Sequence, residues 1–223
     1  MVGRVPPPRR RRHLTDGGPS KRFQPYSFDA GANFTRLRID CDRTFVVEDP
    51  DATTQTWIEG LSSTAMWGGL AYDVDEEDGE RVLEVDCRAN SATGAYLVNV
   101  YVPTRSILAV TFIATSGTLV IYPDTLVNAS SGSISITNAN AGTVFVQDRA
   151  LSIQNLHLHA AGAGSIQWDV PTTVVAAAAD LRTSDAGNVT LFASNLFLAL
   201  EMKASTAGRG DIAISSANMT VLT

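Results

Sequence analysis

A glycine recurs at an almost constant interval through the second half of the chain, and this repeat limits the folds that the chain can adopt more than any other feature. The glycines lie at positions 94, 117, 142, 164, 187 and 210, which are 22 to 25 residues apart. After each of the last five glycines, the second and fourth following residues are apolar. These residues are Leu119 and Ile121, Val144 and Val146, Ile166 and Trp168, Val189 and Leu191, and Ile212 and Ile214.

A second apolar segment begins about nine residues after each of the same glycines. A unit of this length cannot cover its own apolar face, so neighbouring units must stack to make a continuous core. The short, β-branched segments and the regular glycines exclude helical hairpins. We therefore predict an all-β protein with a β-solenoid of four and a fraction coils, in which the alanine run 176–179 also occupies a strand position. The second segments contain Leu126; Leu151 and Ile153; Val175; Leu196, Leu198 and Leu200; and Met219 and Val221.

Composition divides the chain into three regions. Residues 1–25 combine Pro, Gly and Arg without an apolar period, which predicts a disordered basic tail that is dispensable for folding. Residues 26–106 contain short runs with a period of two, so we expect a β-rich N-terminal capping region there. Residues 107–223 are expected to form the solenoid repeats, continuous with that region.

The charge of the chain is unevenly distributed. The net charge of −6 combines 17 basic with 23 acidic side chains, and seven of the basic side chains but only one acid, Asp16, lie in residues 1–22. The rest of the chain carries 10 basic against 22 acidic side chains, a net charge of −12. A surface this acidic repels phosphate backbones, so we expect no nucleic-acid partner for the folded part. No apolar stretch reaches the length of a membrane span, and we expect no secretion signal at the N-terminus.

Two cysteines, Cys41 and Cys87, lie in similar strand-like contexts, each directly after an Ile-Asp or Val-Asp pair. They are candidates for cross-strand neighbours joined by a disulfide. Two thiols are equally compatible with a reduced intracellular protein. The sequence leaves both alternatives open.

Two segments carry residue types that metal sites use. His157 and His159 are two apart on one face of an expected strand, a spacing that zinc and copper sites use, but no third ligand lies nearby in sequence. We expect an outward-facing polar surface there, with Leu156 and Leu158 pointing inward. The Asp-Gly pair in the acidic segment 73–80 predicts a hairpin, and its glycine stands one position too late for an EF-hand calcium loop. We therefore predict no metal site and no cofactor.

Polysaccharide-cleaving β-helix enzymes align carboxylates of neighbouring coils, so the register of the acids tests for such an active site. Asp124 and Arg149 both lie seven residues after their glycines, and Asp180 and Lys203 both lie sixteen after theirs, so each pair is expected to stack as opposite charges. The chain also lacks a nucleophile elbow, a phosphate-binding loop and a His-Glu-x-x-His motif. We predict no catalytic residues and no enzymatic activity. The other acids of the repeat, at scattered register positions, are Asp148, Asp169, Asp185 and Asp211.

Several segments resemble the bacterial putative adhesin domains of unknown function, also described as auto-transporter adhesin head domains. The resemblance rests on residues 98–103 (VNVYVP), 108–110 (LAV), 116–121 (SGTLVI) and 131–136 (SGSISI). It covers about residues 30–223. It implies a β-solenoid and a cell-surface or envelope-associated protein, and it transfers no catalytic residue.

A solenoid presents long, rigid and repetitive faces, which suit the binding of proteins or glycans. We therefore expect a non-enzymatic structural or adhesin-like interaction module. The alternatives are a carbohydrate-active β-helix enzyme and an accessory subunit tethered by its basic tail. Because residues 210–223 read as an incomplete last coil without a polar cap, we also expect this segment to self-associate or to contact a partner.

Overall fold

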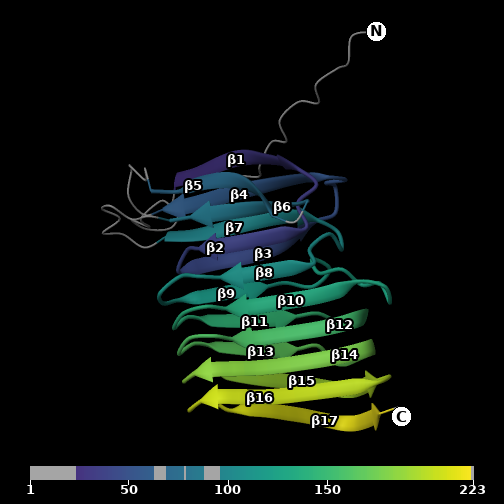
Figure 1. Cartoon of the computed structure of the whole chain (residues 1–223). Helices are drawn as coiled ribbons and strands as arrows, with labels where there is room; N and C mark the ends of the chain where they lie inside the picture. Colours follow the sequence, from purple (N-terminus) through teal and green to yellow (C-terminus); the bar gives the residue numbers. More distant parts are fainter. Residues whose placement is uncertain (1–23, 63–68, 78, 88–95, 222–223) are drawn as a thin grey trace, which may run out of the picture.

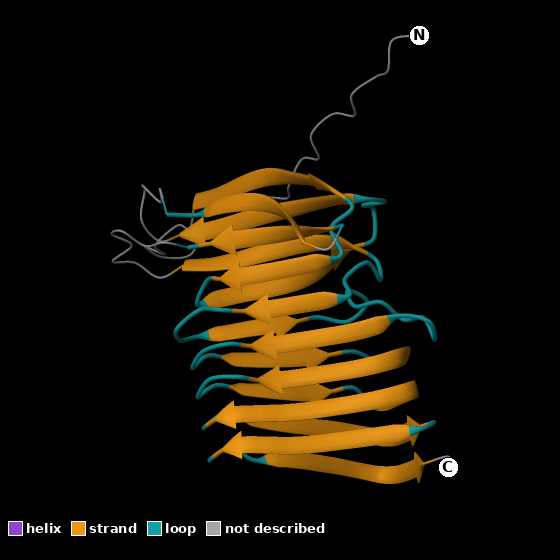
Figure 2. Cartoon of the chain, viewed as in Figure 1, coloured by secondary structure: helices purple, strands orange, loops and turns teal. Residues whose placement is uncertain are grey.

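The computed structural model describes residues 24–62, 69–77, 79–87 and 96–221. Within these residues all regular structure is β, and seventeen strands form one sheet that winds into a solenoid (Figure 2). The predicted all-β solenoid is confirmed. The predicted basic tail 1–25 lies outside the described residues, except for its last two positions.

The strands stack into two long faces, with successive coils piled from the N-terminal to the C-terminal end of the molecule (Figure 1). Face A contains, in spatial order, β5 (Ala71–Glu77), β6 (Glu80–Asp86), β2 (Arg36–Asp40), β8 (Ala109–Phe112), β10 (Ser133–Asn138), β12 (Ala150–Ala160), β14 (Thr172–Asp185) and β16 (Glu201–Gly208). Face B contains β1 (Gln24–Ala32), β4 (Gln55–Ser62), β7 (Tyr96–Pro103), β3 (Arg43–Asp49), β9 (Thr118–Ile121), β11 (Thr143–Gln147), β13 (Ser165–Asp169), β15 (Asn188–Leu198) and β17 (Ile212–Val221).

The coil formed by β2 and β3 does not stack in chain order. β2 lies between β6 and β8, and β3 lies between β7 and β9, with all four pairings parallel. Antiparallel strands close the N-terminal end beyond this point, with β5 beside β6 and with β4 and β1 beside β7. β2 and β3, although they come early in the chain, thus connect the later strands β6 and β7 to the regular coils that begin with β8 and β9.

A third, shorter face appears in the C-terminal coils. Residues 150–153, 172–175, 195–198 and 218–221 pair in parallel along it. At its corner Trp168 is fully buried, and its indole Nε1 donates a hydrogen bond of 3.1 Å to the Oγ1 of Thr173. This bond satisfies the only polar atom of the indole, which allows the ring to fill the core.

The inward-facing positions form continuous apolar ladders. Val144, Ile166 and Val189 are fully buried in register, and Ile212 is half-buried in the last coil. The alanine run 176–179 lies within β14, as expected. The prediction for Leu200 is wrong, because this side chain is 70% exposed at the corner after β15. The chain turns there, so the period of two that points Leu196 and Leu198 inward ends before it.

The repeated glycines lie where neighbouring coils approach most closely. A Cβ atom on Gly164 would overlap the carbonyl oxygen of Gly142, and one on Gly210 would overlap that of Gly187. Glycine is needed at these positions for packing, because each corner carbonyl occupies the space that a side chain of the next coil would need.

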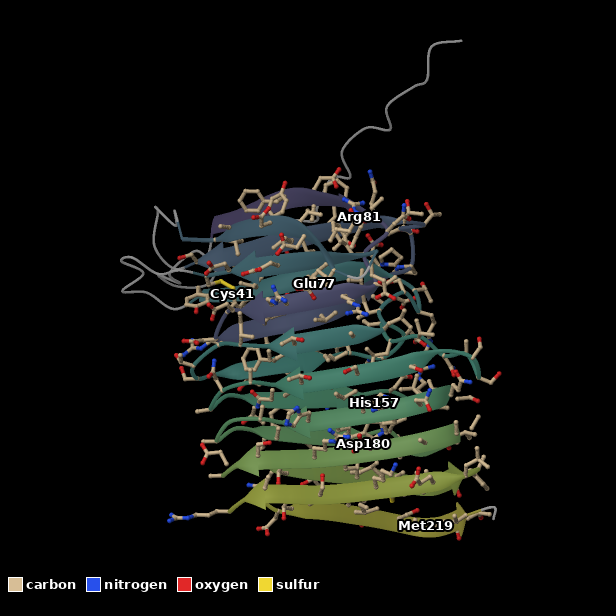
Figure 3. All side chains as sticks on the ribbon, in the orientation of Figure 1. Cys41, Glu77, Arg81, His157, Asp180 and Met219 are labelled. Atoms are coloured by element: carbon tan, nitrogen blue, oxygen red, sulfur yellow. A yellow bond between two sulfur atoms is a disulfide. The ribbon has the colours of Figure 1, made fainter. Side chains whose placement is uncertain are left out.

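The two cysteines form a disulfide between Cys41 and Cys87, with a Cα–Cα distance of 4.9 Å (Figure 3). Cys41 follows β2 and Cys87 follows β6, and the backbone amide of Cys87 donates to the carbonyl of Asp40 at 3.0 Å. The parallel pairing of β2 with β6 brings the two strand ends together. This pairing decides between the alternatives that the sequence leaves open.

The predicted hairpin at the acidic segment is confirmed. β5 and β6 pair antiparallel up to Glu77 opposite Glu80, so the two strands form a hairpin. Gly79 has a φ of +79°, a conformation that glycine adopts without strain.

Candidate functional site

A row of aromatic side chains crosses face B from strand to strand. The register places Trp57 of β4 opposite Tyr101 of β7, and Tyr101 opposite Val47 of β3. Tyr122 directly follows β9 and is level with Val47, since its amide donates to the carbonyl of Val46. We call Trp57, Tyr101 and Tyr122 the aromatic row, in which Val47 occupies the position between the two tyrosines. It crosses four adjacent strands, which at the usual inter-strand spacing is a span of about 14 Å.

Two rings of this row are well placed to contact a ligand. Trp57 is 37% exposed and Tyr122 is 38% exposed, and both lie on a rigid sheet surface. The ring of Phe45, on β3, stacks on Tyr122 with a centroid separation of 6.1 Å. The row therefore offers flat apolar surface at both of its ends.

A pocket of about 430 Å³ opens at the Trp57 end of the aromatic row. We call it the Trp57 pocket. Its volume is within the range of small-molecule binding sites. Its walls come from β1, the end of β3, β4 and β7. The lining residues are Ser27, Glu48, Asp49, Trp57, Ile58, Glu59 and Tyr101.

A hydrogen-bonded group orients Tyr101 in the pocket wall. Glu59 is only 5% exposed, and its Oε2 accepts hydrogen bonds from the Tyr101 hydroxyl at 3.1 Å and from Asn99 Nδ2 at 3.3 Å. Asn99 Nδ2 also lies 3.3 Å from the Tyr101 hydroxyl oxygen. Since these bonds exist in the protein itself, little side-chain freedom is lost when a ligand contacts this ring.

Two further carboxylates stand at the end of β3. The Glu48 carboxylate accepts a hydrogen bond from the hydroxyl of Thr104, and Asp49 Oδ1 accepts one from the backbone amide of Asp51 at 3.1 Å. Neither carboxylate has an ion-pair partner within the described part of the chain. The pocket thus combines two aromatic rings with three acidic side chains.

Comparison with known proteins supports the fold. The chain is similar to the crystal structure of a putative adhesin from Bacteroides fragilis, with a TM-score of 0.53, 14% identity, and coverage of 88% of this chain and 99% of that one. The chain has the fold of a putative adhesin. Two structures from Parabacteroides distasonis also match: a putative adhesin at a TM-score of 0.47, with 11% identity over 92% of this chain and 98% of that one, and a putative lipid binding protein at 0.46, with 16% identity over 88% and 94%.

No family model matches the chain, and no curated protein matches it. Among the described residues, no helix is long and apolar enough to cross a membrane. The fold that this chain shares with the Bacteroides fragilis protein confirms the resemblance seen in the sequence.

The histidine pair of β12 lies on face A, where Leu156 and Leu158 point inward and are fully buried, as predicted. His157 and Asp180 are both on the side of the molecule that Figure 3 shows, and His157 Nδ1 lies 4.0 Å from Asp180 Oδ2. His159 Nε2 lies 3.2 Å from Ser184 Oγ. The described residues contain no group of three or more side chains that could hold a metal ion.

Asp180 and Lys203 occupy the predicted register, opposite each other on β14 and β16. The closest cation to Asp180 is nevertheless Arg182, whose Nε donates to Asp180 Oδ1 at 2.9 Å, while Lys203 Nζ lies 3.2 Å from Glu201. The hydrogen bond from Arg182 lowers the pKa of the Asp180 carboxyl, with smaller contributions from His157 and Lys203, against the effect of burial. Asp180 is therefore a paired surface carboxylate.

The predicted pairing of Asp124 with Arg149 is wrong. Arg105 ion-pairs with both Asp124 and Asp148, and its Nη2 lies 3.1 Å from Asp148 Oδ1. Arg149 has no ion pair with any described residue. Arg105 lies in the turn after β7, before the first glycine whose coil carries the repeated apolar pattern, so the comparison of register positions between those coils could not identify it.

The remaining acids do not form a carboxylate pair in register. Asp169 lies beside Gln147 and Phe192 on face B, Asp185 is the last residue of β14 and has a φ of +63°, and Asp211 is exposed before β17. The residues of the Trp57 pocket were not identified from the sequence. The alternating pattern around Tyr101 predicts a strand, but no sequence pattern predicts that Tyr101 lies beside Trp57 or in one row with Tyr122.

Proposed function

We propose that the protein is a non-enzymatic, adhesin-like binding module that binds an extended saccharide along the aromatic row. The observation that carries this proposal is the alignment of Trp57, Tyr101 and Tyr122 across four adjacent strands, with a pocket at one end. Aromatic rings offer a large apolar face at low entropic cost, and the apolar faces of sugar rings stack on such surfaces. Carboxylates and the Asn99 amide can bind sugar hydroxyl groups beside them.

The spacing of the row also supports an extended chain as ligand. Neighbouring strands are about 4.8 Å apart, which is close to the length that one pyranose unit adds to an extended polysaccharide. A saccharide that crosses the strands can thus place two successive units over Trp57 and Tyr101, a third over Val47, and the next over the Tyr122–Phe45 stack. A rigid sheet keeps these platforms at fixed separations without a ligand.

The disulfide supports a location outside the reducing cytoplasm, since such bonds persist mainly in oxidising compartments. The sequence resemblance implies the cell surface or the envelope. A binding module at that location meets extended glycans. The location is therefore part of the same proposal.

Substitution of Trp57 tests the proposed function. We expect Trp57→Ala and Tyr122→Ala each to weaken binding to a panel of linear oligosaccharides by at least tenfold, measured by calorimetry, because each removes one stacking platform. Phe197→Ala is the matched control, since Phe197 is similarly exposed on the third face. Its affinities should be unchanged.

Two outcomes contradict the proposal. If no oligosaccharide of the panel binds, or if Trp57→Ala and Phe197→Ala bind equally well, the aromatic row is not the binding surface. If the oligosaccharides are recovered shortened after incubation with the protein, the module is an enzyme.

We further propose that the C-terminal coil binds a second copy of the chain. Six large apolar side chains are exposed around β15 and β17, and Met219 is near the lower end of the molecule in Figure 3. Three of them, on β17, stand in register with the buried Leu191, Leu196 and Leu198 of β15, so the apolar ladders end in exposed side chains at this end of the solenoid. Exposed apolar surface of this kind marks interaction surfaces. On β16, Glu201 and Lys203 flank Met202. If the β16 strands of two copies paired antiparallel about Met202, Glu201 of each copy would lie opposite Lys203 of the other. The exposed residues are Phe192, Phe197, Leu200, Ile214, Met219 and Val221.

Light scattering over a range of concentrations tests this self-association. We expect a dimer at high concentration and its loss in Lys203→Glu, because two glutamates would then face each other at both ends of the pairing. The exchange variant Glu201→Lys/Lys203→Glu should restore the dimer. A monomer at every concentration, or an exchange variant no better than Lys203→Glu alone, would show that the β16 strands do not pair in this way.

A further inference from the structure

The charge of the Trp57 pocket restricts the chemistry of its ligand. Glu48, Asp49 and Glu59 line the pocket, and none of its described lining residues is Lys, Arg or His. Glu48 and Asp49 carry the argument, because their hydrogen-bond donors are the neutral hydroxyl of Thr104 and a backbone amide. An anionic ligand would bring like charges together in a half-enclosed space, which is costly.

The aromatic rings of the same pocket favour a cation. Trp57 and Tyr101 border the space that the carboxylates face. An ammonium group above the face of a tryptophan or tyrosine ring is attracted by the ring quadrupole, and the attraction grows as the group loses water. A protonated amine in this pocket would thus contact both the rings and the carboxylates, and no cation among the described lining residues would compete with it.

We infer that the pocket binds an amine-bearing sugar unit, so that the ligand of the aromatic row is a saccharide with unacetylated amino groups. This inference rests on the proposed function and names the class of saccharide. A lysine side chain of a partner protein could also fill the pocket, but it would contact only the pocket and not the rest of the aromatic row. The saccharide is favoured because the aromatic surface continues from Trp57 across the strands to Tyr122 and Phe45, where a single side chain would not reach.

Binding of three oligosaccharides of equal length tests the inference: a glucosamine oligomer, an N-acetylglucosamine oligomer and a glucose oligomer, each titrated by calorimetry at a pH that keeps the amines protonated. We expect the glucosamine oligomer to bind at least tenfold more tightly than the other two. The preference should fall as the salt concentration rises, because it is electrostatic.

Paired variants separate the charge from the stacking. Glu48→Gln/Asp49→Asn should weaken binding of the glucosamine oligomer at least tenfold and so remove the preference. The glucose oligomer should lose much less affinity, because the new amides can still hydrogen-bond to its hydroxyl groups. Trp57→Ala should weaken all three. Asp73→Asn/Asp75→Asn is the matched control, because it removes two exposed carboxylates from β5 at the edge of face A. It should retain the full preference.

The outcomes distinguish this inference from the proposed function. If the three oligosaccharides bind equally well and Trp57→Ala weakens them all, the pocket does not select amines, while saccharide binding stands. If polylysine binds in a Trp57-dependent manner and no saccharide does, the partner is a protein and both proposals fail. If the preference survives Glu48→Gln/Asp49→Asn, the carboxylates do not cause it and the inference is overturned.

Discussion

Val189→Asp is expected to lower the free energy of unfolding by about 4–5 kcal/mol or to prevent folding, because it places a carboxylate in the centre of an apolar ladder. Val189 is fully buried on β15 between Ile166 of β13 and Ile212 of β17. None of these neighbours can donate a hydrogen bond through its side chain. The carboxylate would therefore remain unpaired or protonated at a high cost.

Urea unfolding of a matched pair of variants tests this expectation. Thr190→Asp changes the next residue of the same strand, which is half-buried and points outward, and should cost about 1 kcal/mol or less. Val189→Ala keeps the fold measurable if the aspartate variant does not fold, and should cost about 2 kcal/mol. If Val189→Asp and Thr190→Asp cost the same, the assignment of inward and outward positions is wrong.

The second large effect is expected from loss of the disulfide. The Cys41–Cys87 bond closes a loop with a sequence separation of 46. In the chain-entropy model, a cross-link over a loop of this length stabilises the folded state by about 4 kcal/mol. We expect Cys41→Ala/Cys87→Ala to lose most of this amount in urea unfolding. The physical reason is that the bond restricts the unfolded chain.

A reducing agent provides the control for this experiment. It should destabilise the original chain by a similar amount and leave the double variant unaffected. A reducing agent without effect on the original chain would show that the bond does not contribute to stability. The bond also joins β2 to β6, so its loss should loosen the N-terminal coils first, which hydrogen exchange can follow.

Local patterns allowed the sequence to predict the regular part of the solenoid. Leu119, Val144 and Ile166 stand at a fixed distance from their glycines, and each neighbouring coil repeats the same pattern. When every unit has the same period, in-register stacking is the arrangement that buries all apolar faces together. The prediction failed where the pattern ends, at Leu200, and where a charged partner lies in a turn before the first coil with the apolar pattern, as Arg105 does for Asp124.

Only the tertiary structure decided the arrangement of the N-terminal coils and of the candidate site. β3 lies between β7 and β9, although β4, β5 and β6 separate it from them in the chain, and this order brings Trp57, Tyr101 and Tyr122 into one row. The alternation within each strand predicts that the side chain points outward. It does not predict which strand lies next to it. Strand pairing depends on contacts between distant segments, whereas the repeat and the alternation are local. The apolar ladders were therefore determined by the sequence alone, and the disulfide and the binding surface were determined by the order in which the coils pack.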